Sequence, residues 1–249
     1  MRAGFTRTYQ RLSRFLPPSL AGRLDWHLLP DLAQRFGGPF NGQSGRTEIF
    51  HQILRAIPFQ AIVETGTYVG TTTLYLQKNS HLPVYTVEAV PRFYYYSQQR
   101  FKFQPTIHPF LGDSRIFLTK LSESPSVPHD CVFFYLDAHW REDLPLAREL
   151  EIIAEHWKNP VIMIDDFQVP DDAGYRFDDY GAGKRLTMEY LPEVIASEFR
   201  LFWPVVRGEQ ETGLCRGCVV AGRNLLSAKS LESVAGLRGI APQPSAQTR

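Results

Sequence analysis

The sequence predicts an α/β domain in which helices cover both faces of a mostly parallel β-sheet. Short, nearly continuous apolar runs recur from about residue 44 onward, and such runs are typical of strands buried on both faces. Amphipathic stretches of helical length separate these runs, which favours parallel strands joined by helical crossovers. We therefore expect a doubly wound, mostly parallel sheet of seven strands with an antiparallel pair near the C-terminus.

Length and composition exclude several other classes of protein. The chain has 249 residues, of which 43% are hydrophobic and 21% charged, and this excludes a disordered chain, a collagen and a coiled coil. No apolar run approaches the roughly 20 residues of a membrane-spanning helix. The formal net charge of +1 argues against a nucleic-acid partner. Three cysteines are too few for a disulfide scaffold, so a cytoplasmic location is expected.

The N-terminal 24 residues differ from the rest of the chain because they contain five arginines and no acidic residue. Four apolar residues recur among them at helical spacing: Phe5, Tyr9, Leu12 and Leu16. This pattern is typical of a basic amphipathic helix, which packs on the domain, docks on a partner or binds a membrane surface. An organelle transit peptide is a further alternative.

The rest of the chain divides into elements that follow one another in order. Helix 46–57 keeps its apolar residues on one face, with Ser44 as a candidate cap and Pro58 as its stop. Helix 145–157 has Pro145 in its first turn and apolar residues at helical spacing. The other expected helices begin near Thr71 and span 91–103, and the expected strands are 61–64, 83–88, 106–111, 131–137, 161–165, 199–206 and 217–221. The expected parts are an N-terminal extension (1–43), the main domain (44–222) and a C-terminal tail (223–249).

Acidic residues stand at the ends of the first five expected strands: Glu64, Glu88, Asp113, Asp137 and the pair Asp165 and Asp166. Ligands of open α/β sheets bind outside the carboxyl ends of the strands. Because the acids recur at every such end, we expect them to surround one ligand site. Two flanking segments are candidates to cover it. The glycine-rich loop 36–45, with Asn41, Gln43 and Arg46, either folds over the site or is a plain linker, and the acidic stretch 165–179 is interpreted as a mobile lid or a solvated loop.

The turn from Glu64 to Gly70 has the pattern Glu-x-Gly-x-x-x-Gly rather than the Gly-x-Gly-x-x-Gly of dinucleotide sites. Gly66 allows a sharp turn, and Gly70 allows a ligand to approach closely. An acid at this turn suits a ligand with a cationic amino group. Glu88 lies where a carboxylate accepts hydrogen bonds from ribose hydroxyls, and Asp113 is placed to accept from an adenine amino group. A nucleoside that carries an amino acid, such as S-adenosylmethionine, satisfies these conditions.

The ordered series of motifs resembles that of the class I S-adenosylmethionine-dependent methyltransferases over residues 44–222. The motifs are Glu64-Thr-Gly-Thr-Tyr-Val-Gly70, Thr86-Val-Glu88, Gly112-Asp-Ser114, Phe134-Tyr-Leu-Asp137 and Ile164-Asp-Asp166. The resemblance implies a Rossmann-like methyltransferase fold and an enzyme that uses S-adenosyl-L-methionine. The cofactor-binding residues that it implies are Glu64, Gly66, Tyr68, Gly70, Glu88, Asp113 and Ser114.

Within this class, Asp137, Asp165 and Asp166 resemble the metal ligands of the catechol-type and macrolide-sugar-type O-methyltransferases. The resemblance implies a Mg²⁺ ion, and three converging carboxylates favour a cation because they otherwise raise one another's pKa. Such a metal would bind and orient a substrate hydroxyl together with Asp137. The alternative is that Asp165 and Asp166 are helix caps or ion-pair partners. Trp140 stands where the catechol-type enzymes have a catalytic lysine, so His139 is the candidate base, with a structural role at a helix start as its alternative.

The leading hypothesis from the sequence is Mg²⁺-assisted O-methylation of a small-molecule hydroxyl. A nicotinamide-dependent oxidoreductase is an alternative, although the missing Gly-x-Gly-x-x-Gly counts against it. A non-catalytic binding protein on the same fold is another. The aromatic run 93–103 is interpreted mainly as core, with a homodimer contact as the alternative. Sugar hydroxyls, phenols and polyketide-derived hydroxyls all fit as acceptors.

Overall fold

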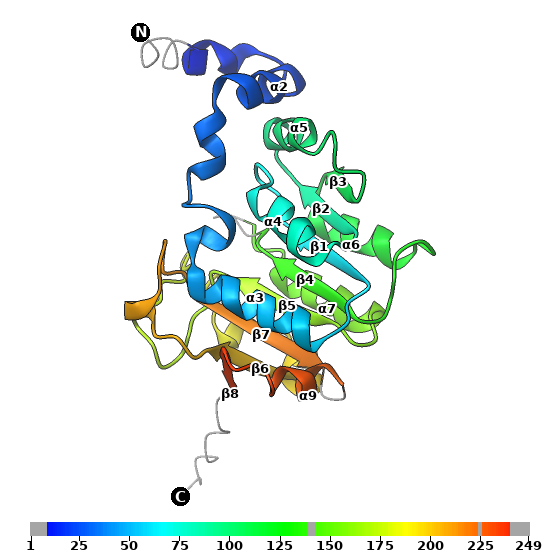
Figure 1. The fold of residues 1–249 in the computed structure, drawn as a ribbon, viewed down its shortest axis with the longest axis vertical. Coiled ribbons are helices and arrows are strands. Elements are labelled where there is room, and N and C mark those ends of the chain that lie inside the picture. The colour runs from blue at the N-terminus through cyan, green and yellow to red at the C-terminus, as the bar shows by residue number, and fades with distance from the viewer. Residues whose placement is uncertain (1–8, 139–142, 224–225, 240–249) are drawn as a thin grey trace, which may run out of the picture.

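The structure is a computed structural model that describes residues 9–138, 143–223 and 226–239. Within these ranges one eight-stranded sheet runs through the molecule (Figure 1). The strands lie side by side in the order β3 (Ile107–Leu111), β2 (Val84–Glu88), β1 (Ala61–Thr65), β4 (Val132–Leu136), β5 (Val161–Asp165), β7 (Cys218–Arg223), β6 (Phe199–Pro204) and β8 (Leu237–Gly239). The first five strands are parallel, and the three C-terminal strands are antiparallel to their neighbours. The predicted mostly parallel sheet with antiparallel C-terminal strands is therefore confirmed, but it has eight strands instead of the seven predicted, because β8 adds a strand beside β6.

Helices cover both faces of this sheet. The described helices are α2 (Pro18–Leu28), α3 (Ser44–Ala56), α4 (Thr71–Ser80), α5 (Pro91–Arg100), α6 (Ser114–Ser122), α7 (Leu146–His156), α8 (Glu193–Glu198) and α9 (Ser227–Leu231). Short 3₁₀ turns are η1 (Ser13–Phe15), η2 (Pro30–Gln34), η3 (Pro39–Gly42), η4 (Met188–Tyr190) and η5 (Gly208–Gln210). Because both faces are covered, all five residues of β1, β4 and β5 are buried, as expected for a doubly wound sheet.

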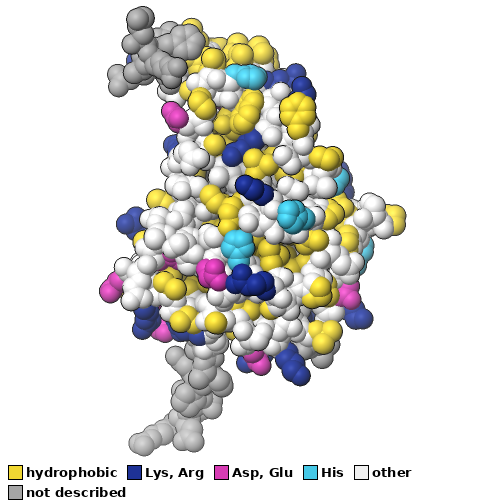
Figure 2. Space-filling view, in the orientation of Figure 1, with side chains coloured by type: hydrophobic (Ala, Val, Ile, Leu, Met, Phe, Trp, Pro, Cys, Tyr) yellow, Lys and Arg dark blue, Asp and Glu magenta, His cyan; other side chains and the backbone are white. Residues whose placement is uncertain are grey.

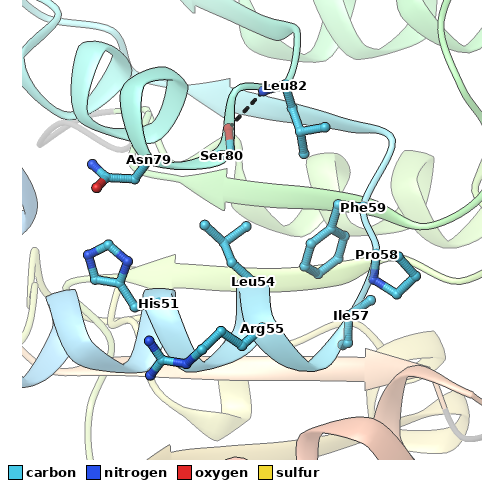
Figure 3. Close-up of a pocket in the computed structure, with 9 residues that line it drawn as sticks. All are labelled: His51, Leu54, Arg55, Ile57, Pro58, Phe59, Asn79, Ser80 and Leu82. Atoms are coloured by element: carbon cyan, nitrogen blue, oxygen red, sulfur yellow. Dashed lines mark hydrogen bonds between the residues drawn. The ribbon is translucent and has the colours of Figure 1, made fainter.

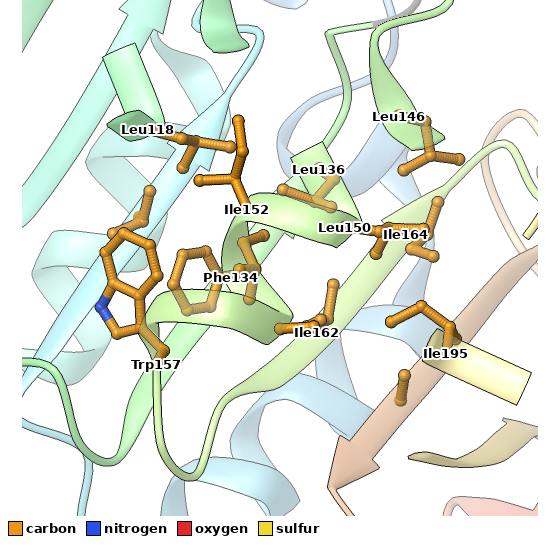
Figure 4. Packing of buried hydrophobic residues seen from close by; sticks show 14 of the residues in the cluster. Leu118, Phe134, Leu136, Leu146, Leu150, Ile152, Trp157, Ile162, Ile164 and Ile195 are labelled. Carbon is orange, nitrogen blue, oxygen red and sulfur yellow. The ribbon is translucent and has the colours of Figure 1, made fainter. Parts of the chain in front are cut away.

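Successive residues of a strand point to opposite faces of the sheet, so β4 contributes to two separate cores. Phe134 and Leu136 point toward α6, α7 and α8, where they pack with Trp157 (Figure 4). Phe133 and Tyr135 point to the other face, where the buried residues of α3, α4 and α9 gather. This alternation matters for the site, because it decides to which face the acids at the strand ends are directed.

The N-terminal helix α2 packs against α5 at one end of the molecule (Figure 1). Asp25 of α2 is 2% exposed, and it accepts two hydrogen bonds from the guanidinium of Arg92, at 2.5 and 2.8 Å. The Tyr9 hydroxyl donates to the same carboxylate at 2.8 Å, and Arg92 also donates to the Ser13 hydroxyl at 2.8 Å. The basic N-terminal segment is therefore anchored to the domain through one buried acid that its own sequence supplies.

The C-terminal segment extends the folded domain further than the sequence predicts. The expected tail begins at residue 223, but α9 and β8 follow and bring the described fold to Gly239. Strand β8 pairs with β6 and forms the edge of the sheet, and Gln52 of α3 accepts a 2.7 Å hydrogen bond from the Gly236 amide. Two elements of five and three residues are too short to show a period in the sequence, so the boundary at 223 is corrected.

None of the helices in residues 9–138, 143–223 and 226–239 is both long and apolar enough to cross a membrane.

The contact between α2 and α5 gives a test of the fold. A methyl group added at Gly22 would lie 2.2 Å from the Arg92 carbonyl oxygen, so Gly22→Ala should destabilise the protein by about 1–3 kcal/mol. Helix propensity alone predicts the opposite, a gain of about 1 kcal/mol. Urea unfolding measures the difference, and Gly239→Ala is the control, since nothing lies within 4 Å of its added methyl group. A Gly22→Ala protein that is more stable than the wild type would disprove the close helix contact.

Candidate active site

The acids predicted at the strand ends lie at one edge of the sheet, because the parallel strands β1, β2, β4 and β5 all end there. Glu64 is the most enclosed of them, at 0% exposure. Its Oε2 accepts hydrogen bonds from the hydroxyls of Thr73 (2.5 Å) and Thr86 (2.6 Å). Its Oε1 is buried and has no hydrogen-bond partner among the described residues. Burial raises the pKa of Glu64 to about 7 although both hydroxyls oppose the shift.

Glu88 lies beside this group at the end of β2 and is 7% exposed. One carboxylate oxygen accepts from the Tyr68 amide at 2.6 Å and the other from the Val90 amide at 2.8 Å. These bonds connect the glycine-rich turn after β1 to the turn after β2. Burial raises the pKa of Glu88 to about 7 against the effect of the amides. Each oxygen keeps a lone pair for a further donor.

The sequence predicts a sharp turn at Gly66 and close approach of a ligand at Gly70. In the structure, both glycines leave room for other atoms of the protein. Gly66 has a φ of +93°, and an added Cβ would lie 2.2 Å from the Asp137 carbonyl oxygen. Gly70 has a φ of +76°, and an added Cβ would lie 2.3 Å from the ring of Phe101. The backbone at Gly66 therefore approaches the end of β4 closely, and Gly70 leaves room for an aromatic ring of the protein itself. The sharp turn agrees with the prediction, whereas the close approach is to protein atoms.

Tyr68, between these glycines, has a positive φ of 48° and packs against two other rings. Its ring centroid is 4.6 Å from that of Phe93 on α5 and 5.5 Å from that of Phe36. The glycine-rich loop that contains Phe36 thus reaches the turn after β1. Of the two interpretations of this loop from the sequence, the contact agrees with the one in which the loop folds over the strand ends.

Asp113 and Ser114 lie at the start of α6, after β3. The Asp113 carboxylate accepts from the amides of Arg115 (2.8 Å) and Ile116 (3.4 Å), so it is the N-cap of the helix. Its ion pair with the Arg115 side chain lowers the pKa of Asp113. Ser114 is buried at the first position of the helix. Contact of either residue with a cofactor stays a prediction.

Asp165, the first of the three expected metal ligands, forms a buried ion pair with Arg46 of α3. Arg46 is 1% exposed and Asp165 is 0% exposed. The other Asp165 oxygen accepts from the Tyr135 hydroxyl and, at 3.2 Å, from the Asn41 amide, and the Asp166 amide donates at 2.7 Å. Burial raises the pKa of Asp165, and the positive charge of Arg46 opposes that shift. The donors fill the lone pairs with which this carboxylate could bind a cation.

Asp166, the second expected ligand, is directed to another arginine. Arg216 donates from Nε to Asp166 at 2.6 Å and also pairs with Asp178. The Arg216 backbone is held by Gln43, whose side chain accepts from the Arg216 amide at 2.8 Å and donates to its carbonyl at 2.9 Å. Arg46 donates to the same carbonyl. The two arginines are therefore parts of one network between the glycine-rich loop and the start of β7.

Asp137, the third expected ligand, is partly buried at the end of β4. Its amide donates to the Thr65 carbonyl at 2.8 Å, which fixes the backbone beside Gly66. Burial raises the pKa of Asp137 well above its ordinary value, and the negative charges of Asp165 and Asp166 add to the shift. Asp137 therefore lies close enough to Asp165 and Asp166 for the charges of both to act on its carboxyl group.

The donor set does not fit the expected Mg²⁺ site. In the described ranges no three acidic, histidine or cysteine side chains are grouped so that they could hold a metal ion. Arg46 and Arg216 supply two fixed positive charges to Asp165 and Asp166, and a Mg²⁺ ion placed between these carboxylates would meet both guanidinium groups. The alternative interpretation from the sequence, in which Asp165 and Asp166 are ion-pair partners, agrees with these contacts.

Sequence reasoning missed the partners in this network. Arg46 was a candidate contact for the ligand, yet it lies on the same helical stripe as Ile49, Phe50 and Ile53, and that spacing indicates burial. Ser44 does not cap its helix. Instead the Glu211 carboxylate accepts from the Gly45 amide at 2.9 Å. Arg216 carries no signal in the sequence, because its partners Asp166 and Asp178 are 50 and 38 residues away.

The stretch 165–179 is fastened to the domain, whereas the sequence favours a mobile lid. Phe167, Val169 and Tyr175 are buried, and the Tyr175 hydroxyl donates to the Val206 carbonyl at 2.9 Å. These three buried side chains and the Asp178 ion pair keep the segment packed against the domain. The candidate base His139 lies outside the described residues.

A hollow of about 330 Å³ lies between α3 and α4, at the end of the sheet opposite to the acids (Figure 3). Phe59 at its wall precedes β1, so this hollow is near the amino ends of the strands. The Arg55 side chain at its rim is paired with Glu48 and is largely exposed. The hollow contains none of the acids predicted from the sequence, and ligands of open α/β sheets bind at the carboxyl ends.

Comparison with known proteins shows the fold. No model of a protein family matches the sequence, and no curated protein matches it. Among solved structures, an O-methyltransferase from Bacillus cereus in complex with SAH is similar over 90% of this chain and 100% of its own, with a TM-score of 0.55 and 17% identity. The O-methyltransferase TomG from Streptomyces achromogenes, in complex with SAM, is similar over 87% of this chain and 96% of its own, with a TM-score of 0.54 and 17% identity. The chain thus has the Rossmann-like fold of class I methyltransferases.

The buried ion pair gives a prediction that can be measured by unfolding. Arg46→Met and Asp165→Asn should each destabilise the protein by about 3–5 kcal/mol, because each leaves one partner buried without its counter-charge. The double variant should lose less than the sum of the two, with a coupling of about 0.5–3 kcal/mol. Urea unfolding of the four proteins measures this cycle. Additive losses would show that the two side chains do not interact directly.

Proposed function

We propose that this protein is an S-adenosylmethionine-dependent methyltransferase that methylates a hydroxyl group of a small molecule. The observation that carries the proposal is the fully buried Oε1 of Glu64 at the end of β1, next to Glu88, for which no described residue supplies a hydrogen bond. A buried carboxylate oxygen without a donor is costly, so it is typical of a site that a ligand completes. The methyltransferase fold supports the same conclusion.

Glu64 and Glu88 fit the two polar ends of the cofactor. The amino group of the cofactor's methionine part is cationic and would donate to the free Oε1 of Glu64, which favours the ionised carboxylate. The ribose hydroxyls would donate to the remaining lone pairs of Glu88. Tyr68 would border the ligand, since its amide already holds Glu88 in place. Gly66 and Gly70 shape the turn between them. Asp113 and Ser114 would border the adenine end.

When bound, the cofactor supplies an electrophilic methyl group. The acceptor hydroxyl must then lose its proton, and Asp137 is the described group best placed to receive it. Asp137 follows the last residue of β4 and lies opposite Gly66, and burial raises the pKa of its carboxyl group, which makes it a stronger proton acceptor than an ordinary aspartate. His139 is a second candidate base from the sequence.

Magnesium is not part of this proposal. The sequence indicates Mg²⁺ as the agent that binds and orients the acceptor, but Asp165 and Asp166 are already paired with arginines. Arg46 and Arg216 therefore provide the positive charge at this edge of the sheet. Orientation of the acceptor would depend on the walls of the site and on hydrogen bonds to Asp137.

Cofactor binding should depend on pH. S-Adenosylhomocysteine should bind with a Kd in the micromolar range, which is about −7 to −8 kcal/mol. Both glutamates have a pKa of about 7 in the free protein, so they are largely protonated at pH 6 and ionised at pH 8. Because the bound ligand favours the ionised form of each glutamate, affinity should rise about tenfold for each of them between these two pH values, and so about a hundredfold when both must be ionised. Isothermal titration calorimetry measures the affinity.

Matched variants separate the roles of these residues. Glu64→Gln should weaken binding and flatten its pH dependence, and Glu88→Gln should weaken it by about 1.5–3 kcal/mol. Glu123→Gln, an exposed change at the end of α6, is the control and should change neither. A folded wild-type protein that gives no heat with S-adenosylhomocysteine at any pH would contradict the proposal.

Turnover tests the chemistry. Transfer of a labelled methyl group should be measured on a panel of phenol, sugar and polyketide hydroxyls, with Mg²⁺ and with EDTA. Activity should survive EDTA, since the arginine pairs leave no carboxylate set for the metal. Asp137→Asn should lower kcat by about 10²-fold or more while S-adenosylhomocysteine still binds, because a proton acceptor is lost. Loss of activity in EDTA that Mg²⁺ restores would show that the ion pairs open to admit a metal.

A further inference from the structure

The N-terminal segment 9–28 has one face toward the domain and one toward solvent. Its inner face contains Ala21, Gly22 and Asp25 of α2, all buried against α5. Asp25 is the only acidic residue of this segment, and its carboxylate already accepts hydrogen bonds from Arg92 and Tyr9. The outer face therefore carries no acidic side chain.

Three arginines stand on the outer face: Arg11, Arg14 and Arg23 are exposed. None of them forms an ion pair with another residue in the described part of the chain, and Arg23 lies over the ring of Tyr95 at 5.9 Å. The chain beyond residue 24 is acidic on balance, with 22 basic and 26 acidic residues. The segment is therefore a local concentration of positive charge on an otherwise acidic protein.

Large apolar side chains are exposed among these arginines. Phe15 is 87% exposed, Leu12 63% and Leu20 46%. Figure 2 shows hydrophobic side chains gathered at the α2 and α5 end of the molecule. Single exposed leucines are common on protein surfaces. Here three large apolar side chains lie within nine residues, among arginines that form no ion pair with the described residues. Such a surface is suited to bind an interface that is both apolar and negatively charged.

We propose that this face, defined by Arg11, Leu12, Arg14, Phe15, Leu20 and Arg23, binds the surface of an anionic lipid bilayer. The apolar side chains would enter the interfacial region, while the arginines would contact the lipid headgroups. A second copy of the chain is a poorer occupant, because a two-fold contact of this face with itself would bring the unpaired arginines of both copies together. The proposal is independent of the methyltransferase reaction, since it rests on the outer face of the segment 9–28.

The experiment uses the full chain and vesicles of known composition. Co-sedimentation should be compared between vesicles of phosphatidylcholine alone and vesicles that contain about one third phosphatidylglycerol. The protein should bind the anionic vesicles at least tenfold more tightly, and 0.5 M NaCl should remove most of this binding because salt screens charges near the surface. Equal binding to the neutral vesicles, or none to either, would overturn the proposal.

Two pairs of variants locate the contact. Arg11→Glu combined with Arg14→Glu should weaken binding at least tenfold, whereas Lys78→Glu combined with Lys120→Glu, which makes the same change of charge on exposed lysines of α4 and α6, should not. Phe15→Ser should weaken binding, whereas Phe103→Ser, at a side chain that is 82% exposed elsewhere, should not. Equal losses within either pair would overturn the assignment to this face. So would a dimer in analytical ultracentrifugation that Phe15→Ser dissociates while no vesicle is bound.

Discussion

The buried ion pair between Arg46 and Asp165 is the interaction on which the carboxyl edge of the sheet depends. It connects the first turn of α3 to the last residue of β5. Tyr135 and Asn41 also donate hydrogen bonds to the Asp165 carboxylate. Phe40 and Asn41 both adopt a left-handed backbone in the loop before α3. This conformation is unfavourable for a phenylalanine, but the complete burial of the Phe40 ring among Phe50, Tyr75 and Tyr135 offsets it.

This pair divides the acids at the strand ends into two kinds. Asp165 and Asp166 are neutralised by arginines, and their charge holds the glycine-rich loop and the start of β7 in place. Glu64 and Glu88 form no ion pair within the part of the chain that the structure describes, and burial raises the pKa of each to about 7. The proposed function uses this difference: Glu64 and Glu88 would receive the cationic amino group and the ribose hydroxyls of the cofactor, whereas Asp165 and Asp166 already have arginine partners.

The sequence determined the sheet and the position of its ligand edge. Strands β1, β4 and β5 are short, mostly apolar runs with an acidic residue at or directly after their carboxyl end, and the helices between them show clear periods, as in α7. These signals are local, because each follows from the geometry of one strand or one helix. The motif series places Glu64, Glu88 and Asp137 at neighbouring strand ends for the same reason, and the parallel sheet keeps them together.

Only the tertiary structure decided what these acids contact. The partners Arg46 and Asp165 are 119 residues apart, and no pattern within a helix or strand indicates which guanidinium meets which carboxylate. Local patterns also do not indicate that Phe101 fills the space beside Gly70. Strand β8 is too short to be recognised in the sequence, and it is defined only by its pairing with β6. Sequence periodicity encodes which face of an element is buried. The choice of partner on that face depends on side chains that packing brings together from distant parts of the chain.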